Sequence, residues 1–474
     1  MRLAYVLFAY LLAPVVCGVM LWRGLRDRSY WRNFGERFGY GHGPDSAGSI
    51  WIHAVSVGEV QAAASLVAAL RERYPQVPLV VTSVTPTGAQ RARELFREGV
   101  LVRYVPYDLP GSVRRFFDRV RPRVAIILET ELWPTLYHEC GRRRVPLVLA
   151  SARISPRSVG RYRRLAGLFR ETLSHGIVIA AQSDGDAERF RTIGANPAKT
   201  HVTGNIKFDF TLPEDIRARG AALRARYAGA RPVWIAGSTH EGEEDAVLEA
   251  HRAVRAAGHD ALLVLVPRHP NRFASVADRL QSQGVSFMRR TADIGKASGP
   301  EPGNGGRRHP GGASGSSQGQ VLLVDTLGEL LTFYAASDVA FVAGSLVPIG
   351  GHNLLEPVAV GVPVLTGPHV FNAEDIAQLL LDEGAAVMIR DAGDLAATVV
   401  ELLGDPARRA RIADAGYAVL ARNRGALARL LALLGPVIEY RPLRDDSRGV
   451  PRAGRAAGPG GGLSAGSGRP SADR

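Results

Sequence analysis

The sequence predicts an α/β protein built from two parallel-sheet domains, preceded by an apolar helix. Three observations lead to this fold class. The chain has 474 residues, more than one hydrophobic core usually holds, so two domains are expected. Short apolar runs alternate with amphipathic stretches in two sets, which is typical of parallel sheets covered by helices on both faces. Leu3 to Trp22 contains no charged residue.

The apolar run at the N-terminus is long enough to cross a hydrocarbon layer of roughly 30 Å. Its basic flank, which begins at Arg23 and Arg26, follows the run, whereas a cleavable signal peptide places its charge before it. We therefore predict an uncleaved membrane anchor over residues 1–22, with the rest of the chain on the cytoplasmic side of an inner membrane. Pro14 and the single run also allow a shallow insertion. Residues 23–49 are interpreted as a linker.

The first domain is expected over residues 50–210. Its predicted strands are Ile50–Ala54, Leu79–Thr82, Leu101–Val105, Val124–Leu128, Leu147–Ala150 and Ile177–Ala181. The alternation predicts a Rossmann-like sheet, although no G-x-G-x-x-G is present. The pattern weakens over 211–231, which we interpret as the inter-domain connection.

The second domain is expected over residues 232–440. Its predicted strands are Val233–Gly237, Leu262–Val266, Val321–Val324, Val339–Val342 and Val362–Thr366. Residues 291–320 contain nine Gly and three Pro, so they are expected to form a disordered surface insertion without a catalytic role. The Arg-, Gly- and Ser-rich residues 441–474 are expected to be a disordered tail.

The charge distribution indicates an anionic partner. The net charge is +14, and residues 111–170 contain 14 Arg against four acidic residues. Such an excess favours an anionic membrane surface or a phosphorylated lipid, although a solvated basic surface explains it equally well. Nucleic acid is disfavoured, because there is no zinc-finger spacing and no aromatic RNA-reading motif. Cys17 and Cys140 do not form a disulfide framework, which fits a reducing compartment.

A glycine-rich segment from Ala343 to Pro357 follows the predicted strand Val339–Val342. Glycines let a backbone approach a ligand, helix N-termini attract phosphate, and a carboxylate one turn later can accept ribose hydroxyls. The alternative is an ordinary turn before a helix. The expected nucleotide-binding residues of this segment are Gly344, Ser345, Gly350, Gly351, His352, Asn353 and Glu356.

Two further strand ends complete the predicted nucleotide site. Gly237, Ser238 and Thr239 follow one strand and are expected to lie under the nucleotide. Arg268 follows the next strand, and its guanidinium suits a phosphate or a carboxylate. The neighbouring His269 is also a candidate nucleotide-binding residue. Taken alone, it is more simply interpreted as a buried structural histidine.

Carboxylates in the first domain are candidates for acid–base chemistry. Glu59 stands in the first turn of a predicted helix after Ser56 and Gly58, where it can cap the helix or accept a proton. Glu129 and Glu131 end a strand and share one face; they either shape an acceptor site or pair with arginines.

No metal is predicted. The histidines are scattered, and the only D-x-D motif, Asp184 to Asp186, precedes a helical stretch, where capping is the expected role. No cofactor is predicted either.

Six motifs occur in one order: WIHAVSVGE (51–59), ETELWP (129–134), GNIKFD (204–209), AGSTHEGEE (236–244), PRHPNR (267–272) and AGSLVPIGGHNLLEP (343–357). With them the chain resembles the 3-deoxy-D-manno-octulosonic acid (Kdo) transferases of lipid A assembly, from about Arg2 to Leu430. The resemblance implies a GT-B architecture, in which two Rossmann-like domains face a cleft and a late helix returns to the first domain. It also implies Glu59 as general base and Lys207 as a site residue.

The implied function is inverting transfer of Kdo from the donor CMP-Kdo to a phosphorylated glycolipid, the lipid A precursor lipid IVA. Two alternatives remain: a sugar-nucleotide epimerase on the same fold, and a non-catalytic membrane scaffold. The anchor disfavours a soluble epimerase, and the complete set of motifs disfavours a scaffold. Neither the number of Kdo residues added nor the oligomeric state follows from the sequence.

Overall fold

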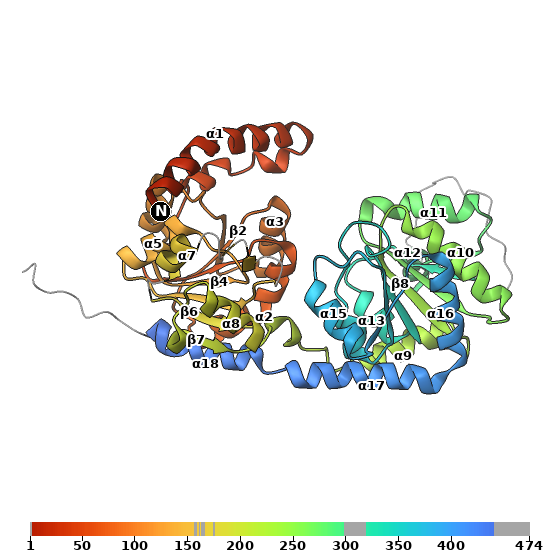
Figure 1. Ribbon diagram of the computed structural model, residues 1–474. Helices are drawn as coiled ribbons and strands as arrows, with labels where there is room; N and C mark the ends of the chain where they lie inside the picture. The colour runs from red at the N-terminus through yellow and green to blue at the C-terminus, as the bar shows by residue number, and fades with distance from the viewer. Residues whose placement is uncertain are drawn as a thin grey trace, which may run out of the picture. The chain divides into compact units, whose positions relative to one another are not determined.

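The computed structural model describes residues 2–155, 159–160, 162, 166–173, 176–297 and 319–439. It contains two parallel sheets of seven strands each, with helices packed on both faces of each sheet (Figure 1). The expected α/β fold class, with two Rossmann-like sheets, is confirmed. We call the part of the chain around each sheet the first lobe and the second lobe.

The first lobe has the strand order β3-β2-β1-β4-β5-β6-β7. Its strands are β1 (Ser49–His53), β2 (Leu79–Ser83), β3 (Val100–Tyr104), β4 (Pro122–Leu128), β5 (Leu147–Ala152), β6 (Val178–Ala181) and β7 (Thr200–Val202). Along β1, Ile50 and Ile52 enter one core layer, while Trp51 enters the other. Every residue of β1 is buried, and its three central residues form an uninterrupted apolar run.

The helices of the first lobe lie between these strands in the sequence. They are α2 (Val57–Arg73), α3 (Pro86–Phe96), α4 (Pro110–Val120), α5 (Pro134–Arg142), α7 (Ala166–Leu173) and α8 (Asp184–Thr192), with short 3₁₀ turns η2 (Phe34–Phe38) and η4 (Ile206–Phe208). Ser56 caps α2 and Thr85 caps α3, each by accepting a backbone N–H from the third residue of the helix. These caps fix where each strand-to-helix turn ends.

The apolar N-terminal run forms one helix, α1 (Arg2–Arg26), which continues past the expected boundary at residue 22. Helix α1 is long enough and apolar enough to cross a membrane. Tyr5 donates a hydrogen bond to the buried carboxylate of Asp108 at 2.8 Å. Asp108 also accepts the backbone N–H groups of Thr135 and Leu136 at the start of α5. Helix α1 is therefore hydrogen-bonded to the first lobe.

The second lobe has the strand order β10-β11-β9-β8-β12-β13-β14. Its strands are β8 (Val233–Thr239), β9 (Leu262–Pro267), β10 (Phe287–Arg289), β11 (Val321–Leu323), β12 (Val339–Val342), β13 (Val364–Thr366) and β14 (Ala386–Met388). Its helices are α9 (Ile216–Tyr227), α10 (Glu243–Ala256), α11 (Phe273–Ser282), α12 (Arg290–Ala297), α13 (Leu330–Ala335), α14 (Leu355–Val360), α15 (Glu374–Asp382), α16 (Ala392–Gly404) and α17 (Pro406–Asn423).

Two boundaries expected in or beside the second lobe also differ from the structure. The stretch 211–231, interpreted as a connection, contains α9, whose Tyr227 enters the core of the second lobe. Its arginine-rich sequence conceals this helix, because few apolar positions mark a buried face. The expected insertion 291–320 begins inside α12, where Asp293 pairs with Arg226 at 2.8 Å. The part of the insertion from 298 to 318 lies outside the described residues, as do residues 440–474.

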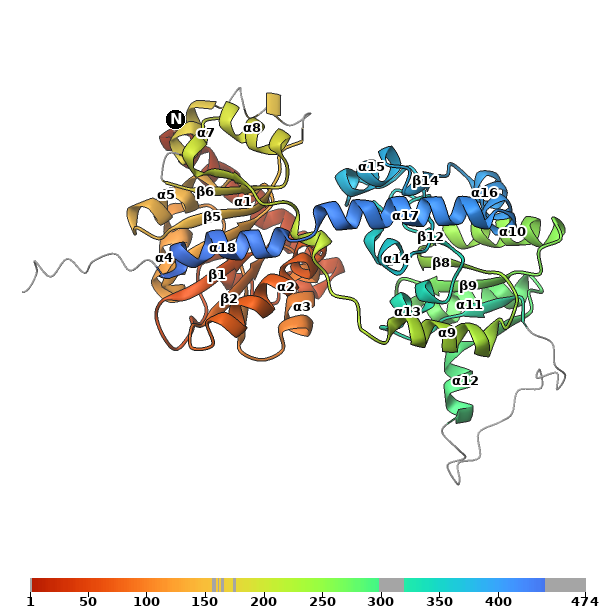
Figure 2. The same ribbon diagram turned by 90° about the horizontal axis from the view of Figure 1, so that it is seen from below.

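The last helix, α18 (Ala426–Glu439), belongs to the core of the first lobe (Figure 2). Its residues Leu430, Leu434 and Ile438 pack in the same cluster as Ile50 and Ile52. Asp209, the last residue of the GNIKFD motif, accepts the backbone N–H groups of Gly425 and Leu427 and so holds the start of α18. The resemblance implied such a returning helix.

Candidate active site

Each lobe places its predicted site residues at or after the carboxyl ends of its strands, where ligands bind in open α/β sheets. In the first lobe these residues follow β1 and β4, and Lys207 lies in η4. In the second lobe Gly237, Ser238 and Thr239 are the last three residues of β8 itself, and the other predicted residues follow β9 and β12.

Glu59 is 9% exposed and stands in the first turn of α2. Its Oε2 accepts the backbone N–H of Val55 at 2.8 Å, and its Oε1 accepts the hydroxyl of Ser56 at 3.1 Å. The Ser56 hydroxyl in turn accepts the backbone N–H of Glu59, so the two side chains cap the start of α2 much as a capping box does, with Glu59 reaching the N–H of Val55 in place of that of Ser56. Glu59 is therefore a capping residue in this structure. Gly58, one residue earlier, is exposed.

Capping does not remove Glu59 from acid–base chemistry. Burial, followed by the negative charge of Glu129, raises the pKa of Glu59 from 4.5 to about 7. A general base is most effective when its pKa lies near the working pH. The position that caps the helix thus also gives a carboxyl group that exchanges a proton near neutrality.

The side chains of Glu129 and Glu131 lie in different environments. Glu129 has a left-handed backbone, with φ of 59°, and its Oε1 lies 2.6 Å from the Nζ of Lys207. Glu131 accepts the indole N–H of Trp133 at 2.8 Å, and burial raises its pKa. Glu129 therefore pairs with a lysine, and neither glutamate pairs with an arginine in the described part of the chain.

Lys207 is held by its own motif. Asn205 caps η4 by accepting the backbone N–H of Lys207 at 2.9 Å. The lysine side chain is 20% exposed and reaches Glu129, 78 residues earlier in the chain. The first lobe thus brings Ser56, Glu59, Glu129, Glu131 and Lys207 to one electrostatically coupled group.

In the second lobe the glycine-rich loop is organised by a residue outside the predicted set. The fully buried Glu243, at the start of α10, accepts the backbone N–H groups of Gly344, Ser345 and Leu346 at 2.8 to 3.1 Å. It also accepts the N–H of His240 at 3.0 Å. The backbone N–H groups of Gly344 and Ser345 are therefore not free donors for a phosphate, because a protein carboxylate already accepts them.

Two other predicted nucleotide residues serve packing. A Cβ on Gly237 would lie 2.3 Å from the hydroxyl of Tyr334, so this glycine makes room for a core side chain. The hydroxyl of Ser345 donates to the carbonyl of Val342 and accepts the N–H of Gly367, which ties β12 to the end of β13. Both residues are buried, and neither presents a free polar group.

Ser238 and Thr239 are the last two residues of β8 and directly precede His240. Ser238 has a left-handed backbone, with φ of 62°. The buried Oγ1 of Thr239 has no hydrogen-bond partner among the described residues. A buried polar atom without a partner is costly, so Thr239 remains a candidate for contact with a ligand.

Three histidines meet beyond the ends of β8, β9 and β12. The Nε2 atoms of His240 and His352 are 2.8 Å apart, and the His269 ring lies edge-on to that of His240, with centroids 5.4 Å apart. His269 itself is exposed, so its interpretation as a buried structural histidine is wrong: it follows β9 and precedes the turn η5 (Pro270–Arg272) rather than facing the core.

Arginines flank the histidines. Arg268 is half-buried, and no carboxylate pairs with its guanidinium in the part of the chain that is described. Arg272 is different, because it forms a two-point ion pair with the buried Glu244, at 2.5 and 3.0 Å. Arg268 is thus the cation that remains available to an anionic ligand.

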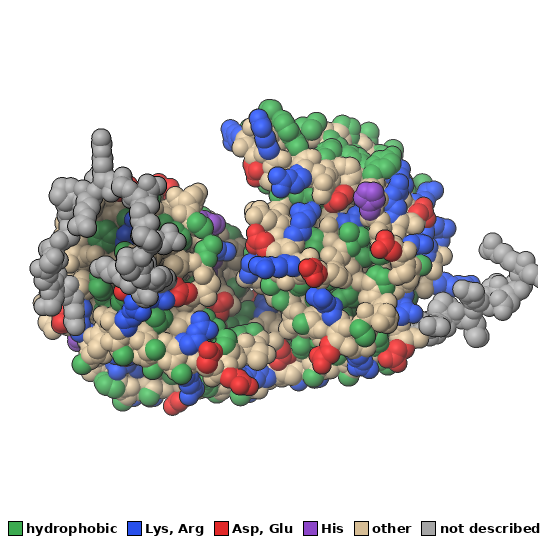
Figure 3. All heavy atoms as spheres, turned by 180° about the vertical axis from the view of Figure 1, so that it is seen from behind, with side chains coloured by type: hydrophobic (Ala, Val, Ile, Leu, Met, Phe, Trp, Pro, Cys, Tyr) green, Lys and Arg blue, Asp and Glu red, His purple; other side chains and the backbone are tan. Residues whose placement is uncertain are grey.

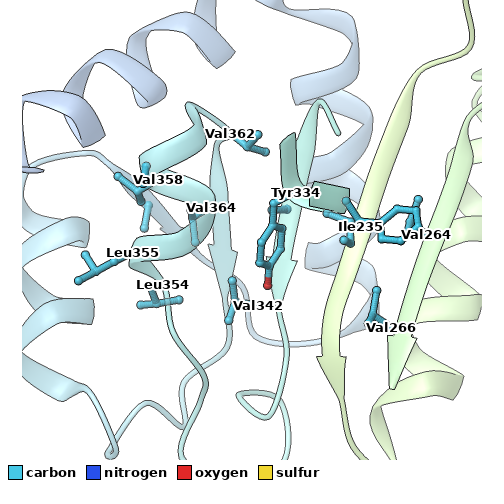
Figure 4. Packing of buried hydrophobic residues seen from close by; sticks show 14 of the residues in the cluster. Ile235, Val264, Val266, Tyr334, Val342, Leu354, Leu355, Val358, Val362 and Val364 are labelled. Atoms are coloured by element: carbon cyan, nitrogen blue, oxygen red, sulfur yellow. The ribbon is translucent and has the colours of Figure 1, made fainter. Parts of the chain in front are cut away.

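Glu356 is positioned by the short helix α14. Leu355 and Val358 of that helix point into the core of the second lobe (Figure 4). Asn353 donates to the Glu356 carboxylate at 3.0 Å, and burial raises the pKa of Glu356. The loop before α14 contains Gly350 and Gly351, both with positive φ.

No group of three metal-binding side chains occurs among the described residues. Asp186 of the D-x-D motif exchanges hydrogen bonds with Ser183, the N-cap of α8, so its expected capping role is confirmed. Sequence reasoning missed His240, Glu243 and Glu244. The acidic cluster beside the strand end was the available signal, since two buried adjacent glutamates need partners.

Comparisons with known proteins agree with these motifs. The family model described as 3-deoxy-D-manno-octulosonic-acid transferase (kdotransferase) matches residues 32–210. The chain is 39% identical over 442 residues to the 3-deoxy-D-manno-octulosonic acid transferase of Haemophilus influenzae, which covers 92% of this chain and 99% of that protein. It is also 39% identical to the transferase of the same name from Bordetella pertussis, over 89% of this chain and 96% of that protein.

A solved structure with the same fold is the UDP-GlcNAc 2-epimerase of Neisseria meningitidis bound to UDP-GlcNAc. It has a TM-score of 0.51 and 12% identity, and the match covers 81% of this chain and all of that one. At that identity the likeness concerns the two-sheet GT-B-type fold alone. The matches at 39% identity span nearly the whole chain, and by them the chain belongs to the 3-deoxy-D-manno-octulosonic acid transferase family of glycosyltransferases.

Proposed function

We propose that this glycosyltransferase transfers Kdo from CMP-Kdo to a hydroxyl of a lipid A precursor, lipid IVA, with inversion at the anomeric carbon. The observation that supports the mechanism most directly is the raised pKa of Glu59, about 7. We infer the transferred sugar, Kdo, from the family. The roles that follow are inferred from the side chains of the site.

In the proposed step the acceptor oxygen attacks the anomeric carbon of Kdo while Glu59 takes the hydroxyl proton. The bond from that carbon to the phosphate oxygen breaks, and its electron pair stays on the phosphate of CMP. One displacement inverts the configuration. Arg268 and the histidines beside it would stabilise the anionic phosphate, as fixed cationic and N–H groups do for a departing oxyanion.

No metal or cofactor is needed for this step. The leaving phosphate would be balanced by protein groups, and the acceptor would be activated by a carboxylate. Transfer that persists unchanged in the presence of a strong chelator would support this part of the proposal.

We further propose that α1 holds the enzyme at the cytoplasmic face of an inner membrane. Hydrophobic side chains gather over this helix (Figure 3), and Leu3, Leu7 and Leu11 are 85%, 64% and 70% exposed. A hollow beside α1 is lined by Arg2, Leu3 and Val6 of that helix and by Arg114, His138, Glu139 and Arg142 of α4 and α5, where Arg142 pairs with Glu139. Apolar and basic walls together suit a phosphorylated glycolipid at an anionic bilayer surface.

The test is transfer of labelled Kdo from CMP-Kdo to lipid IVA in detergent micelles. Labelled lipid whose new glycosidic bond has the opposite anomeric configuration to the donor supports the proposal. An epimerase or a scaffold yields no labelled lipid, and retention of configuration would rule out the single displacement. Mass spectrometry of the exhausted reaction counts the Kdo residues added.

A further inference from the structure

His240 and His352 form a pair in the second lobe. Their Nε2 atoms are 2.8 Å apart, and their ring planes are nearly parallel, at 9°, with centroids 5.0 Å apart. His240 follows β8, and His352 follows the glycine-rich loop after β12. The pair therefore joins two strand ends of the proposed donor site.

The short contact limits how many protons the pair holds. Two imidazole nitrogens at this distance share one hydrogen, which one ring donates and the other accepts. A further proton can enter at Nδ1 of the donating ring, and it makes the shared hydrogen bond charge-assisted and stronger. A proton beyond that would set two N–H groups against each other. The pair is thus built for zero or one positive charge.

Burial and nearby cations favour the neutral form of the pair. Burial and then the charges of His240 and Arg268 lower the pKa of His352 to about 3. Burial also lowers the pKa of His240, and the neighbouring His269, Arg268 and Arg272 act in the same direction.

The carboxylates near the pair are already committed. Glu244 forms its two-point ion pair with Arg272. Glu243 accepts the backbone N–H groups of His240 and Gly344, so it positions the loops that hold both rings. Burial raises the pKa of Glu356, which works against a negative charge there. Positive charge, that of Arg268, is thus in excess around the His240–His352 pair.

The loop is shaped to admit the contact. Gly344 has φ of 72°, and a Cβ at this position would lie 2.8 Å from the Nε2 of His352. A side chain at residue 344 would therefore displace the ring from its partner. This is a structural reason for glycine here that is independent of any phosphate.

We propose that the His240–His352 pair binds the anionic part of the donor and gains one proton as the donor binds. The inference rests on the proposed function, because the phosphate and the sugar carboxylate of CMP-Kdo bring two negative charges to a corner where Arg272 is already paired with Glu244 and only Arg268 stays unpaired among the described arginines beside the histidines. His240 would then be a donor-binding residue, and the added positive charge would stand ready for the charge that develops on departing CMP.

The experiment measures proton uptake by calorimetry on the full chain in detergent. The probe is the methyl ester of CMP, whose phosphodiester does not titrate near neutral pH. Binding enthalpies at pH 6.5 in buffers of different ionisation enthalpy give the protons gained per ligand. We expect about half a proton to one proton per ligand for the wild type. We also expect affinity to rise as pH falls from 8 to 6, because the ligand favours the protonated pair.

Three variants locate the proton. His240→Gln should still bind the probe, more weakly, with uptake near zero and an affinity that no longer depends on pH. His259→Gln is the matched control, since His259 lies in the same lobe away from the pair, and it should behave as the wild type. His269→Gln should keep most of the uptake. Melting curves establish that each variant is folded.

The outcomes are distinguishable. Binding by the wild type without proton uptake overturns this inference and leaves the proposed function standing. Uptake that persists in His240→Gln but disappears in His269→Gln also overturns it, and assigns the proton to His269. No binding of the probe at all contradicts the donor site, and with it both proposals.

Discussion

Glu243 accepts the backbone N–H of Ser345 at 3.1 Å across 102 residues of sequence. The same carboxylate holds the N–H groups of Gly344 and Leu346. A glycine-rich loop after a strand suggests a phosphate cradle, yet here its first amides surround a carboxylate supplied by the neighbouring strand end. The loop is thereby preorganised from within the protein, and the ligand meets the side chains that the loop positions.

Replacing Glu243 with Gln tests this organisation. The amide keeps the size of the side chain but loses the charge and part of the accepting capacity, so buried N–H groups lose good partners. We expect the free energy of unfolding to fall by about 1.5 to 3 kcal/mol and CMP binding to weaken. Chemical denaturation and calorimetry measure the two effects. Glu249→Gln, at an exposed position of the same helix, is the control and should change neither. An equal response of both variants would contradict the special role of Glu243.

Two nested deletions test where the insertion begins. Removing residues 298–318 and joining the ends with a short Gly-Ser link should leave stability and transfer nearly unchanged, because loop length costs little free energy. Removing 291–318 also deletes Thr291, which hydrogen-bonds Asp325, and Asp293, which pairs with Arg226. We expect the longer deletion to be less stable by about 1 to 2 kcal/mol. Equal stability of both would show that α12 contributes nothing.

Tyr5 of helix α1 hydrogen-bonds the buried carboxyl of Asp108 in the first lobe. Tyr5→Phe removes the hydroxyl that donates to Asp108, a carboxyl whose pKa burial raises. We expect a loss of about 1 kcal/mol in the free energy of unfolding and unchanged flotation with anionic vesicles, since the apolar surface of the helix remains. Tyr10→Phe, at an exposed tyrosine of α1, is the control. Deleting residues 1–26 should abolish flotation and also cost stability. A deletion as stable as the wild type would show that α1 serves only as an anchor.

The strands that form the centre of each sheet could be predicted because they are continuous apolar runs. The strands β7, β10 and β14 were missed, because each spans three residues and forms or adjoins a sheet edge, where burial is incomplete. Helix α9 was missed because only Ile216, Gly220 and Tyr227 are buried along it, so few large apolar residues mark a buried face. In each case the local pattern was too short or too polar to show which lobe the residues pack against.

The site was predicted in outline and incompletely in detail. Residues that follow strands could be placed at the same sheet edge from topology alone. The pairing of Glu129 with Lys207, and of Glu243 with the glycine-rich loop, joins residues 78 and 101 to 103 positions apart. Local sequence does not encode such partners. It also could not separate capping from acid–base chemistry at Glu59, because the same carboxyl group caps α2 and has a raised pKa.

Glu59→Gln separates those two roles. The amide retains the shape of the side chain but cannot take a proton from the acceptor. If Glu59 is the general base, turnover should fall by about 10²- to 10⁴-fold when chemistry limits the rate, while CMP binding stays near normal. The pH dependence of transfer in the wild type should rise through about pH 7, where Glu59 loses its proton. Glu129→Gln should move that rise to lower pH, because it removes a negative charge that raises the pKa of Glu59.

Stability gives an independent check with a fixed sign. The pKa of Glu59 is raised from 4.5 to about 7 in the folded protein, so folding favours the protonated carboxyl. This contribution is fully present below pH 4.5 and is lost as pH rises through 7. Relative to Glu59→Gln, the wild type should therefore lose up to about 3 kcal/mol of stability between pH 4.5 and 8. If Glu59→Gln keeps more than about a tenth of wild-type turnover, Glu59 is not the base. Glu131, whose pKa is also raised by burial, is then the next carboxyl group to test.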